Sequence, residues 1–245
     1  MLYTEVKPHQ ALAPYIDAYW TAKGSSKGVV IEKIPPDGCV DIIFNPGDNC
    51  YTESGTVLMK HAQAYLVGTM TRFKETVMTG DTSLLGVRFK PGAVSAFFKQ
   101  TPLQDIVNTT VELGCGGDFS NLLLAKSPVE FLNNYFGKKF TKADPYLLQQ
   151  IDTVKKRKGQ CKVDELASLH CTTVRQLERS FKQYLGITPK QFINLVRCQH
   201  VIKAIEQRTP GQSLLSIAFE YGYYDHAHLT NDFKQYMGTI PSALY

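Results

Sequence analysis

The chain has 245 residues, of which 43% are hydrophobic and 20% are charged. This balance supplies enough apolar side chains for a sizeable core and excludes a disordered, collagen-like or coiled-coil protein. No stretch reaches about 18 uncharged apolar residues, which excludes a membrane-spanning helix, and the first residues lack the basic flank and apolar run of a secretory signal. We therefore expect a cytoplasmic protein with no membrane partner.

The cysteines give no sign of a zinc site or of a disulfide framework. No pair has the C-x-x-C spacing, and a chain of this length does not need disulfides to be stable. We expect reduced, mostly buried thiols. The cysteines are Cys39, Cys50, Cys115, Cys161, Cys171 and Cys198.

The positive charge is unevenly distributed along the chain. The formal net charge is +5; from Asp144 onward there are 13 Lys or Arg and 9 Asp or Glu, whereas the first 143 residues carry 14 and 13. A basic half beside a nearly neutral half is a reason to look for nucleic-acid binding. The basic run at residues 155–158 is either part of such a surface or a solvated helix end.

The first ninety residues predict short strands. Runs of β-branched or aromatic residues alternate with turn formers, such as Pro-Pro-Asp-Gly at 35–38 and Asn-Pro-Gly-Asp at 45–48. Short strands at near-regular spacing predict an antiparallel barrel or sandwich. The expected strands cover residues 29–31, 40–44, 56–59, 65–67 and 84–89, and short helices are expected at 93–99, 119–125 and 128–136.

The second part of the chain predicts helices only. Asp144 followed by Pro145 is a helix start, because the carboxylate can cap the first turn and proline suits its first position. Leu147, Leu148, Ile151 and Val154 then fall on one helical face. We place a domain boundary near residue 141, which gives the domains 1–140 and 141–245 and an α+β protein.

An internal repeat organises the helical half. Residues 177–192 and the segment 52 residues later share seven of 16 positions, including the Phe-Lys-Gln-Tyr run. Each copy predicts a short helix, a tight turn, a longer helix, a Gly stop and a Pro restart. This is the helix-turn-helix format, with helices at 163–169 and 173–185 in the first unit and at 214–221 and 225–237 in the second. A helix at 189–207 would join the units.

The second helix of each unit has an apolar and a polar side. Leu177, Phe181 and Leu185 recur at four-residue spacing, as do Leu229, Phe233 and Met237, so these side chains are expected to pack inward. If the joining helix held both second helices on one face, about 34 Å apart, a monomer could enter two successive major grooves. The alternative is an all-helical core in which these helices only pack.

The ordered motifs of this half resemble the C-terminal DNA-binding domain of the AraC/XylS family of bacterial transcription regulators, over residues 145–245. In the first unit and the joining helix they are Leu166-Ala167, Leu177-x-x-x-Phe181-Lys182, Gly186-Ile187-Thr188-Pro189 and Arg197. In the second they are Ile217-Ala218-x-x-x-Gly222-Tyr223, His228-Leu229-x-x-x-Phe233-Lys234 and Gly238-x-x-Pro241-Ser242. Cys171 departs from the pattern, because the first turn usually carries Gly at a position that can favour a positive φ.

The first half resembles a regulatory domain found fused to this type of DNA-binding domain, which implies a cupin-like β-barrel sensor of unassigned ligand. The resemblance rests on Leu12-Ala13-Pro14-Tyr15-Ile16, Tyr19-Trp20, the segment from Pro36 to Phe44, and the segment from Leu85 to Gly92. Together the two resemblances imply a bacterial, sequence-specific DNA-binding regulator controlled through its N-terminal domain. They imply double-stranded DNA and RNA polymerase as partners, and allow a small-molecule effector and a homodimer.

The family's groove-facing positions can be carried over residue by residue. The first unit supplies two arginines suited to guanine and a glutamate suited to cytosine, so we expect it to provide most of the base discrimination. The second offers one small apolar contact and one amide, and we expect it to contribute more to positioning on the backbone. The implied base contacts are Arg175, Glu178, Arg179, His226, Ala227 and Asn231, and the implied phosphate contacts are Thr173, Lys182, Thr230 and Lys234.

Two other functions are possible for the N-terminal half: an enzyme and an interaction module. A metal-dependent cupin enzyme needs several His and a carboxylate, but this half has only His9 and His61, so we expect no enzyme, metal or cofactor. His226 and His228 point about 200° apart on a helix and are a poor ligand pair. An interaction module without a ligand stays open.

Some residues of this half could line a pocket or fill the core. For Trp20, Tyr65, Phe89 and Phe97 the core is the better expectation. Arg88 lies among apolar residues, and its side chain is either on a solvated strand face or an inward anchor for an acidic ligand or for Asp41. The candidate ligand-binding residues are Trp20, Asp41, Tyr65 and Arg88.

Overall fold

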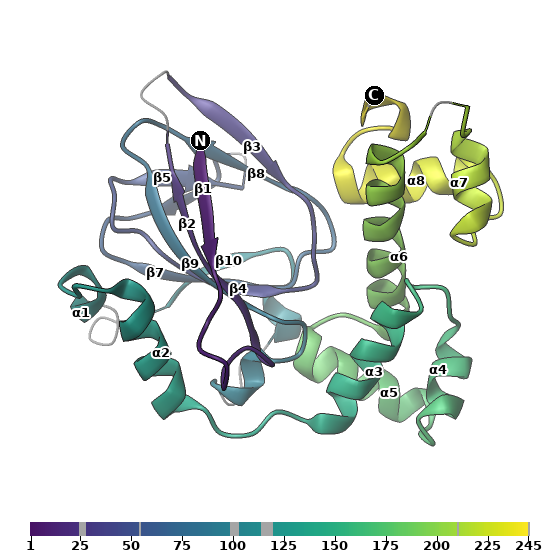
Figure 1. Cartoon of the computed structure of the whole chain (residues 1–245), viewed down its shortest axis with the longest axis horizontal. Helices are drawn as coiled ribbons and strands as arrows, with labels where there is room; N and C mark the ends of the chain where they lie inside the picture. Colours follow the sequence, from purple (N-terminus) through teal and green to yellow (C-terminus); the bar gives the residue numbers. More distant parts are fainter. Residues whose placement is uncertain (25–27, 54, 99–102, 114–119, 210, 245) are drawn as a thin grey trace.

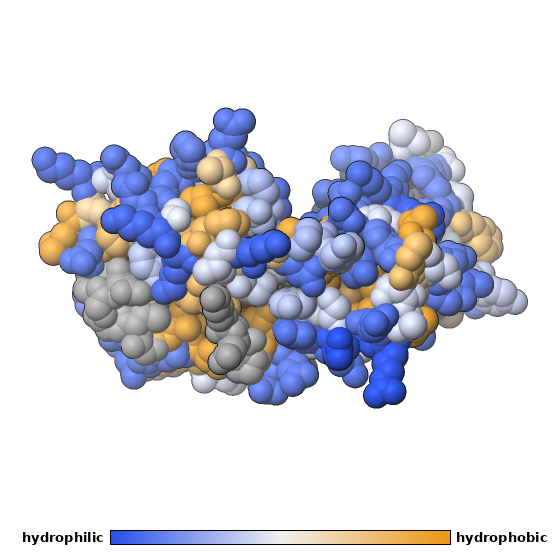
Figure 2. All heavy atoms as spheres, turned by 90° about the horizontal axis from the view of Figure 1, so that it is seen from below, coloured by the Kyte–Doolittle hydropathy of each residue, from blue (hydrophilic) through white to orange (hydrophobic). Residues whose placement is uncertain are grey.

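The computed structural model of the chain describes residues 1–24, 28–53, 55–98, 103–113, 120–209 and 211–244. A strand-rich N-terminal part leads through α1 (Ser120–Leu123) and α2 (Pro128–Lys139) into a helical C-terminal part (Figure 1). The predicted α+β class is therefore confirmed. Hydrophilic residues dominate the face seen from below, with apolar patches scattered between them (Figure 2). None of the helices in the described ranges has the length and apolar character that a membrane crossing requires.

Two antiparallel sheets form the N-terminal part, as the sequence predicts. Within the described ranges, one sheet has the strand order β1-β2-β9-β4-β7-β10 and the other the order β3-β8-β5-β6. The strands are β1 (Leu2–Val6), β2 (Ile16–Lys23), β3 (Val30–Ile34), β4 (Val40–Phe44), β5 (Cys50–Thr52), β6 (Val57–Met59), β7 (Ala64–Val67), β8 (Lys74–Met78), β9 (Ser83–Phe89) and β10 (Thr110–Leu113).

The larger sheet is covered on both faces. In β4 the side chains of Val40, Ile42 and Phe44 enter a core formed with α2 and with two 3₁₀ turns, η1 (Val94–Ala96) and η2 (Leu103–Ile106). Asp41 and Ile43 alternate with them and face the smaller sheet. Because side chains alternate along a strand, one apolar set builds the helix-covered core while the other set builds the space between the sheets.

Several elements differ from the sequence prediction. The strands β1, β2, β5, β8 and β10 were not predicted; β8, for example, carries Lys74 and Glu75, and pairing with its neighbours β3 and β5 holds it in the sheet. The helix expected at 93–99 is only the turn η1, with residue 99 outside the described residues. The helix expected at 119–125 is the shorter α1, and residue 119 is also outside them. The helix expected at 128–136 is present and extends to Lys139.

The C-terminal helices begin and end close to where the sequence predicts. They are α3 (Pro145–Lys156), α4 (Val163–Leu169), α5 (Val174–Leu185), α6 (Pro189–Glu206), α7 (Leu214–Glu220) and α8 (His226–Met237). The Asp144 carboxylate caps α3, and both α5 and α8 end at a glycine in the left-handed region, Gly186 and Gly238. The two helix-turn-helix units, α4–α5 and α7–α8, lie at opposite ends of α6 (Figure 1).

The N-terminal part packs closely against this helical frame. A Cβ atom on Gly186, at the end of α5, would lie 2.5 Å from the carbonyl oxygen of Leu103 in η2. A Cβ atom on Gly238, at the end of α8, would collide with the ring of Phe73. Both glycines are therefore needed for a close approach as well as for a positive φ. The C-terminal end of each second helix thus rests on the N-terminal part.

The turn of the first unit holds a non-glycine residue in the left-handed region. Cys171 has φ 48°, whereas the corresponding residue of the second unit, Gly222, has φ 74°. A side chain at positive φ places Cβ against the backbone, so Cys171 carries strain that Gly222 avoids. This agrees with the strain expected from the family pattern.

We predict opposite effects for two substitutions at this turn. Cys171→Gly should raise the free energy of unfolding by about 0.5–1 kcal/mol, because relief of strain exceeds the entropy that glycine adds to the unfolded chain. Cys171→Val should lower it by about 1 kcal/mol or more, because a β-branched residue is disfavoured there. Urea unfolding followed by circular dichroism measures both. A glycine variant less stable than the parent would contradict the assignment of strain to this turn.

Candidate functional site

The outer side of α5 carries charged side chains. Arg175, Glu178, Arg179 and Lys182 are exposed, whereas Leu177, Phe181 and Leu185 are fully buried beneath them. Thr173 caps the helix: its Oγ1 accepts a hydrogen bond from the Gln176 backbone N–H at 3.2 Å. This cap begins α5 directly after the connecting residues 170–172. The inward and outward sets agree with the sequence prediction.

The outer side of α8 is less charged. His226, Ala227, Asn231 and Lys234 are exposed, Thr230 is half-buried, and Leu229 and Phe233 are buried. The Asp225 carboxylate accepts a hydrogen bond from the His228 N–H at 2.7 Å and so caps the helix. The His228 ring packs edge-on against Tyr223, 5.0 Å between ring centres. In the described residues, no group of three or more His, Cys, Asp or Glu could hold a metal ion.

Arg197 fixes α8 to the joining helix α6. Its Nη2 donates to the Asn194 carboxamide at 3.1 Å and to the Asp232 carboxylate of α8 at 3.5 Å, and its guanidinium lies 4.5 Å from the centre of the Tyr223 ring. The ion pair is mostly buried, with 14% and 16% of the two side chains exposed. The sequence identified Arg197 only as part of a motif. Its positioning role was missed, because Asp232 is 35 residues away in the chain.

A cavity of about 290 Å³ lies between the two sheets of the N-terminal part. Trp20, Asp41 and Arg88 line it, as three of the candidate ligand residues, together with apolar side chains such as Met59, Met78 and Leu84. Tyr65 does not line it: its side chain is 2% exposed and its hydroxyl accepts a hydrogen bond from the Lys60 N–H at 2.7 Å. Phe89 and Phe97 are in the core on the other side of the sheet, as expected.

Arg88 and Asp41 lie opposite each other on β9 and β4. The Arg88 side chain is 22% exposed and contacts carboxylates of Glu5 at 3.1 Å, Asp37 at 3.4 Å and Asp41 at 3.6 Å. Asp41 also accepts a hydrogen bond from the Trp20 indole N–H at 2.7 Å. Burial raises the pKa of Asp41, Arg88 lowers it and Asp37 raises it further, and the balance brings it to about 7. Of the alternatives for Arg88, the inward anchor for Asp41 is therefore the observed one.

The loop that carries Asp37 joins this cavity to the joining helix. The Pro36 carbonyl accepts a hydrogen bond from the Gln199 side chain of α6 at 3.0 Å. A Cβ atom on Gly38 would lie 3.1 Å from the ring of Phe192, also on α6. The ion pair between Asp37 and Arg88 connects the same loop to the cavity wall. One short loop thus contacts both the cavity cluster and the helix between the two units.

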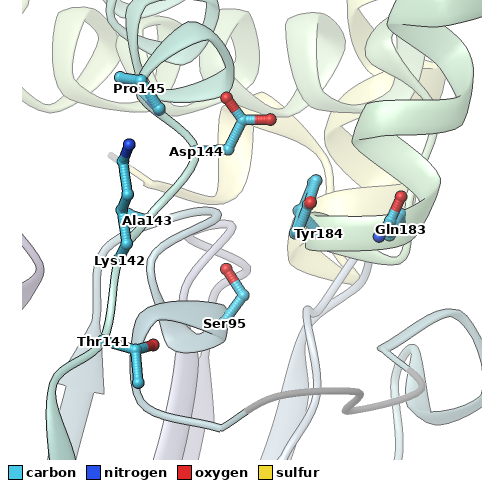
Figure 3. A pocket seen from close by; sticks show the side chains of 8 residues that line it. All are labelled: Ser95, Thr141, Lys142, Ala143, Asp144, Pro145, Gln183 and Tyr184. Carbon is cyan, nitrogen blue, oxygen red and sulfur yellow. The ribbon is translucent and has the colours of Figure 1, made fainter.

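A second pocket, of about 390 Å³, lies where the two parts meet (Figure 3). Ser95, the connection at residues 141–145, and Gln183 and Tyr184 of α5 line it. Its polar groups already serve the fold: the Asp144 carboxylate caps α3, and the Thr141 hydroxyl donates to the Ala96 carbonyl at 2.9 Å. We therefore do not consider it a ligand site.

Comparison with known proteins separates the two parts. A family model described as a helix-turn-helix domain matches residues 166–244, and one described as a domain of unknown function (DUF6597) matches residues 4–112. An uncharacterised HTH-type transcriptional regulator of Haemophilus influenzae is 35% identical over 80 residues, 33% of this chain and 26% of that protein. The HTH-type transcriptional regulator ArgR of Pseudomonas aeruginosa is 31% identical over 78 residues, 32% of this chain and 23% of its own length. The chain thus spans about a quarter of the length of these relatives.

A solved structure, that of ToxT from Vibrio cholerae, matches 92% of this chain and 96% of its own with 14% identity and a TM-score of 0.48. The helix-turn-helix family model covers the helical part, where the two matched units and the ordered motifs are found. The C-terminal part of the chain therefore carries an AraC-type helix-turn-helix domain and is similar in sequence to HTH-type transcriptional regulators.

Proposed function

We propose that this protein is a sequence-specific DNA-binding transcriptional regulator that reads two successive major grooves with α5 and α8 and is controlled through its N-terminal part. The observation that carries the proposal is the pair of matched helices at opposite ends of α6, each buried on one side and polar on the other. A helix with this format can enter a major groove and present side chains to base edges. In this role the protein acts in the cytoplasm and catalyses no reaction.

The first unit supplies most of the base discrimination. Arg175 and Arg179 are exposed on α5 and can each donate to the two acceptors of guanine, and Glu178 can accept from the amino group of cytosine. The second unit presents His226, Ala227 and Asn231, of which the amide of Asn231 suits adenine. Unequal side chains on equivalent helices support unequal roles.

Phosphate contacts hold the protein in register. Lys182 follows buried Phe181 on α5, and Lys234 follows buried Phe233 on α8, so the two units present equivalent cations. Thr173 and Thr230 are the further candidates; the Thr230 hydroxyl lies 3.4 Å from His226 Nδ1. Contacts of this kind set orientation and affinity and carry little sequence information.

Control through the N-terminal part is supported by the contacts between the parts. The ends of α5 and α8 pack on η2 and on Phe73, and the loop with Asp37 contacts α6. A change in the N-terminal part can therefore alter how the two units are held. We propose a small-molecule effector, with homodimer formation and RNA polymerase as further partners. A ligand-free interaction module is the alternative, and a cavity that binds no small molecule would favour it.

The function is tested first by binding to duplex DNA. A selection from a randomised duplex library with the full chain should give a defined site, and residues 141–245 alone should prefer that site over a scrambled duplex. Lys182→Gln should weaken binding to all sequences about equally and reduce the slope of log K against log salt by about one, because one phosphate contact is lost. Lys23→Gln, which removes an exposed lysine of the N-terminal part, is the matched control. A fragment without preference for the selected site would contradict the proposal.

The unequal roles of the two units give a second test. On the selected site, Arg179→Ala should cost about 1–3 kcal/mol and relax the preference at one base position, because a bidentate contact to guanine is lost. Asn231→Ala should cost less. Binding selections with each variant measure both effects. If Asn231→Ala relaxes specificity more, the roles are reversed; if Arg179→Ala weakens every sequence alike, Arg179 contacts phosphate.

A further inference from the structure

The cavity between the sheets opens at their unpaired edges. β1 is one of the two edge strands of the larger sheet and β3 is one of the two edge strands of the smaller one. Met1, Tyr3 and Ile34, which lie on or next to these strands, line the cavity. These three side chains are between 39% and 46% exposed. The cavity is therefore a buried apolar space with a rim of accessible apolar side chains, which is the usual form of a small-molecule site.

The cavity lining has three cations and two carboxylates, and carboxylates are in excess when the ion-pair partners of these cations are counted with them. Among the described residues, the lining cations Arg88, Lys74 and Lys33 each have a carboxylate partner. Arg88 alone contacts the carboxylates of Glu5, Asp37 and Asp41. Glu32 adds a further carboxylate to the lining. A ligand anion would meet cations that are already paired. A ligand cation would meet carboxylates that share one guanidinium, and its charge would favour the ionised form of Asp41.

Lys74, the most buried cation of the lining, is also unavailable to a ligand anion. Lys74 is 8% exposed, and its Nζ donates to Glu53 at 2.5 Å and to the Thr110 hydroxyl at 3.2 Å. Its neighbours at that end, Thr52 and Thr76, are hydrogen-bonded to each other at 3.2 Å. An anion would therefore have to displace Glu53 before it could pair with the buried Lys74, which is costly in a site of low dielectric constant.

Aromatic rings complete a surface that suits a cation. The rings of Tyr3 and Trp20 lie 6.0 Å apart between centres, and both line the cavity. The Trp20 indole N–H is used by Asp41, so its edge is fixed against the carboxylate. Gly86, opposite Trp20 on β9, has no side chain to displace this ring, and a Cβ atom there would collide with it. An ammonium group beside Asp41 would meet the carboxylate, with the Tyr3 and Trp20 rings in the same cavity wall.

We propose that this cavity binds a small organic cation, an amine or quaternary ammonium ion with an apolar or aromatic body. The volume of about 290 Å³ equals that of roughly ten water molecules, which limits the ligand to about ten non-hydrogen atoms. The apolar body would lie against Met59, Met78 and Leu84 and the charged group would lie at the Asp41 end. The proposal rests on the proposed function for its regulatory meaning, since it gives a chemical class to the effector.

The test compares three probes of similar size that differ in charge. Binding of 2-phenylethylammonium, 2-phenylethanol and phenylacetate to the full chain is measured by calorimetry, without DNA. The ammonium ion should bind at least about tenfold more tightly than the alcohol, because the charge adds attraction to Asp41 and the rings. Phenylacetate should bind more weakly than the alcohol. Equal or tighter binding of the carboxylate, or no binding of the ammonium ion, overturns the proposal.

Variants locate the cation within the cavity. Asp41→Asn keeps an acceptor for the Trp20 N–H and removes the charge, and should weaken ammonium binding about tenfold with little change for the alcohol. Glu32→Gln, at a half-buried position on β3, is a second variant that does not disturb the Arg88 cluster, and it should weaken ammonium binding as well. Glu112→Gln removes an exposed carboxylate outside the cavity and should change nothing. If neither cavity variant weakens ammonium binding, the proposal is wrong.

The two proposals fail separately in these experiments. DNA binding is measured on the same preparation with the site obtained by selection. If the protein binds this DNA site and none of the three probes, the proposed function is supported and the proposed ligand class is wrong. If the protein binds the ammonium ion and has no preferred DNA site, the proposed ligand class is supported and the proposed function is wrong.

Discussion

The packing of α6 is the constraint on which the rest of the molecule depends. Near its start, Phe192, Ile193 and Val196 are buried in the core of the first unit; near its end, Val201 and Ile205 are buried in the core of the second. A helix that is apolar on several sides must be covered on several sides. Here the first unit, the second unit and the loop with Gly38 cover it. The relative placement of the two units therefore follows from the side chains of one helix.

Polar contacts make this arrangement specific. An apolar core allows small rotations between helices, but the mostly buried pair of Arg197 and Asp232 has to be matched, because an unpaired charge in that place would be costly. The Tyr223 ring above the guanidinium adds a further restraint on α8. A similar logic applies between the sheets, where Arg88 joins β9 to Asp41 on β4 and to the loop of Asp37. Each charged cluster thus holds segments that are distant in the chain: one joins α6 to α8, and the other joins β9 to β4 and to the loop of Asp37.

The helical part was largely predictable because its signals are local. A carboxylate cap at Asp144, glycine stops at Gly186 and Gly238, and four-residue apolar spacing on α5 and α8 specify helix ends and inward faces within a few residues of the chain. Because the sequence repeats, the glycine stop and the apolar spacing occur in both units. The N-terminal strands were predictable only where β-branched residues dominate, as in β4. In β1 and β8 polar residues are frequent, and pairing with distant strands decides the conformation.

The sequence by itself determined the class of the protein, the two helix-turn-helix units, their exposed residues and the strain at Cys171. It left Arg88 undecided, because a lone arginine in a strand can face solvent, a ligand or a carboxylate, and only the register of β9 against β4 places it opposite Asp41. It left Tyr65 both as a core residue, the better expectation, and as a ligand candidate, and the side chain is in the core and does not line the cavity. The tertiary structure decided these points because a cavity and a charge cluster are built from strands that are distant in the chain, and no local pattern records which strands become neighbours.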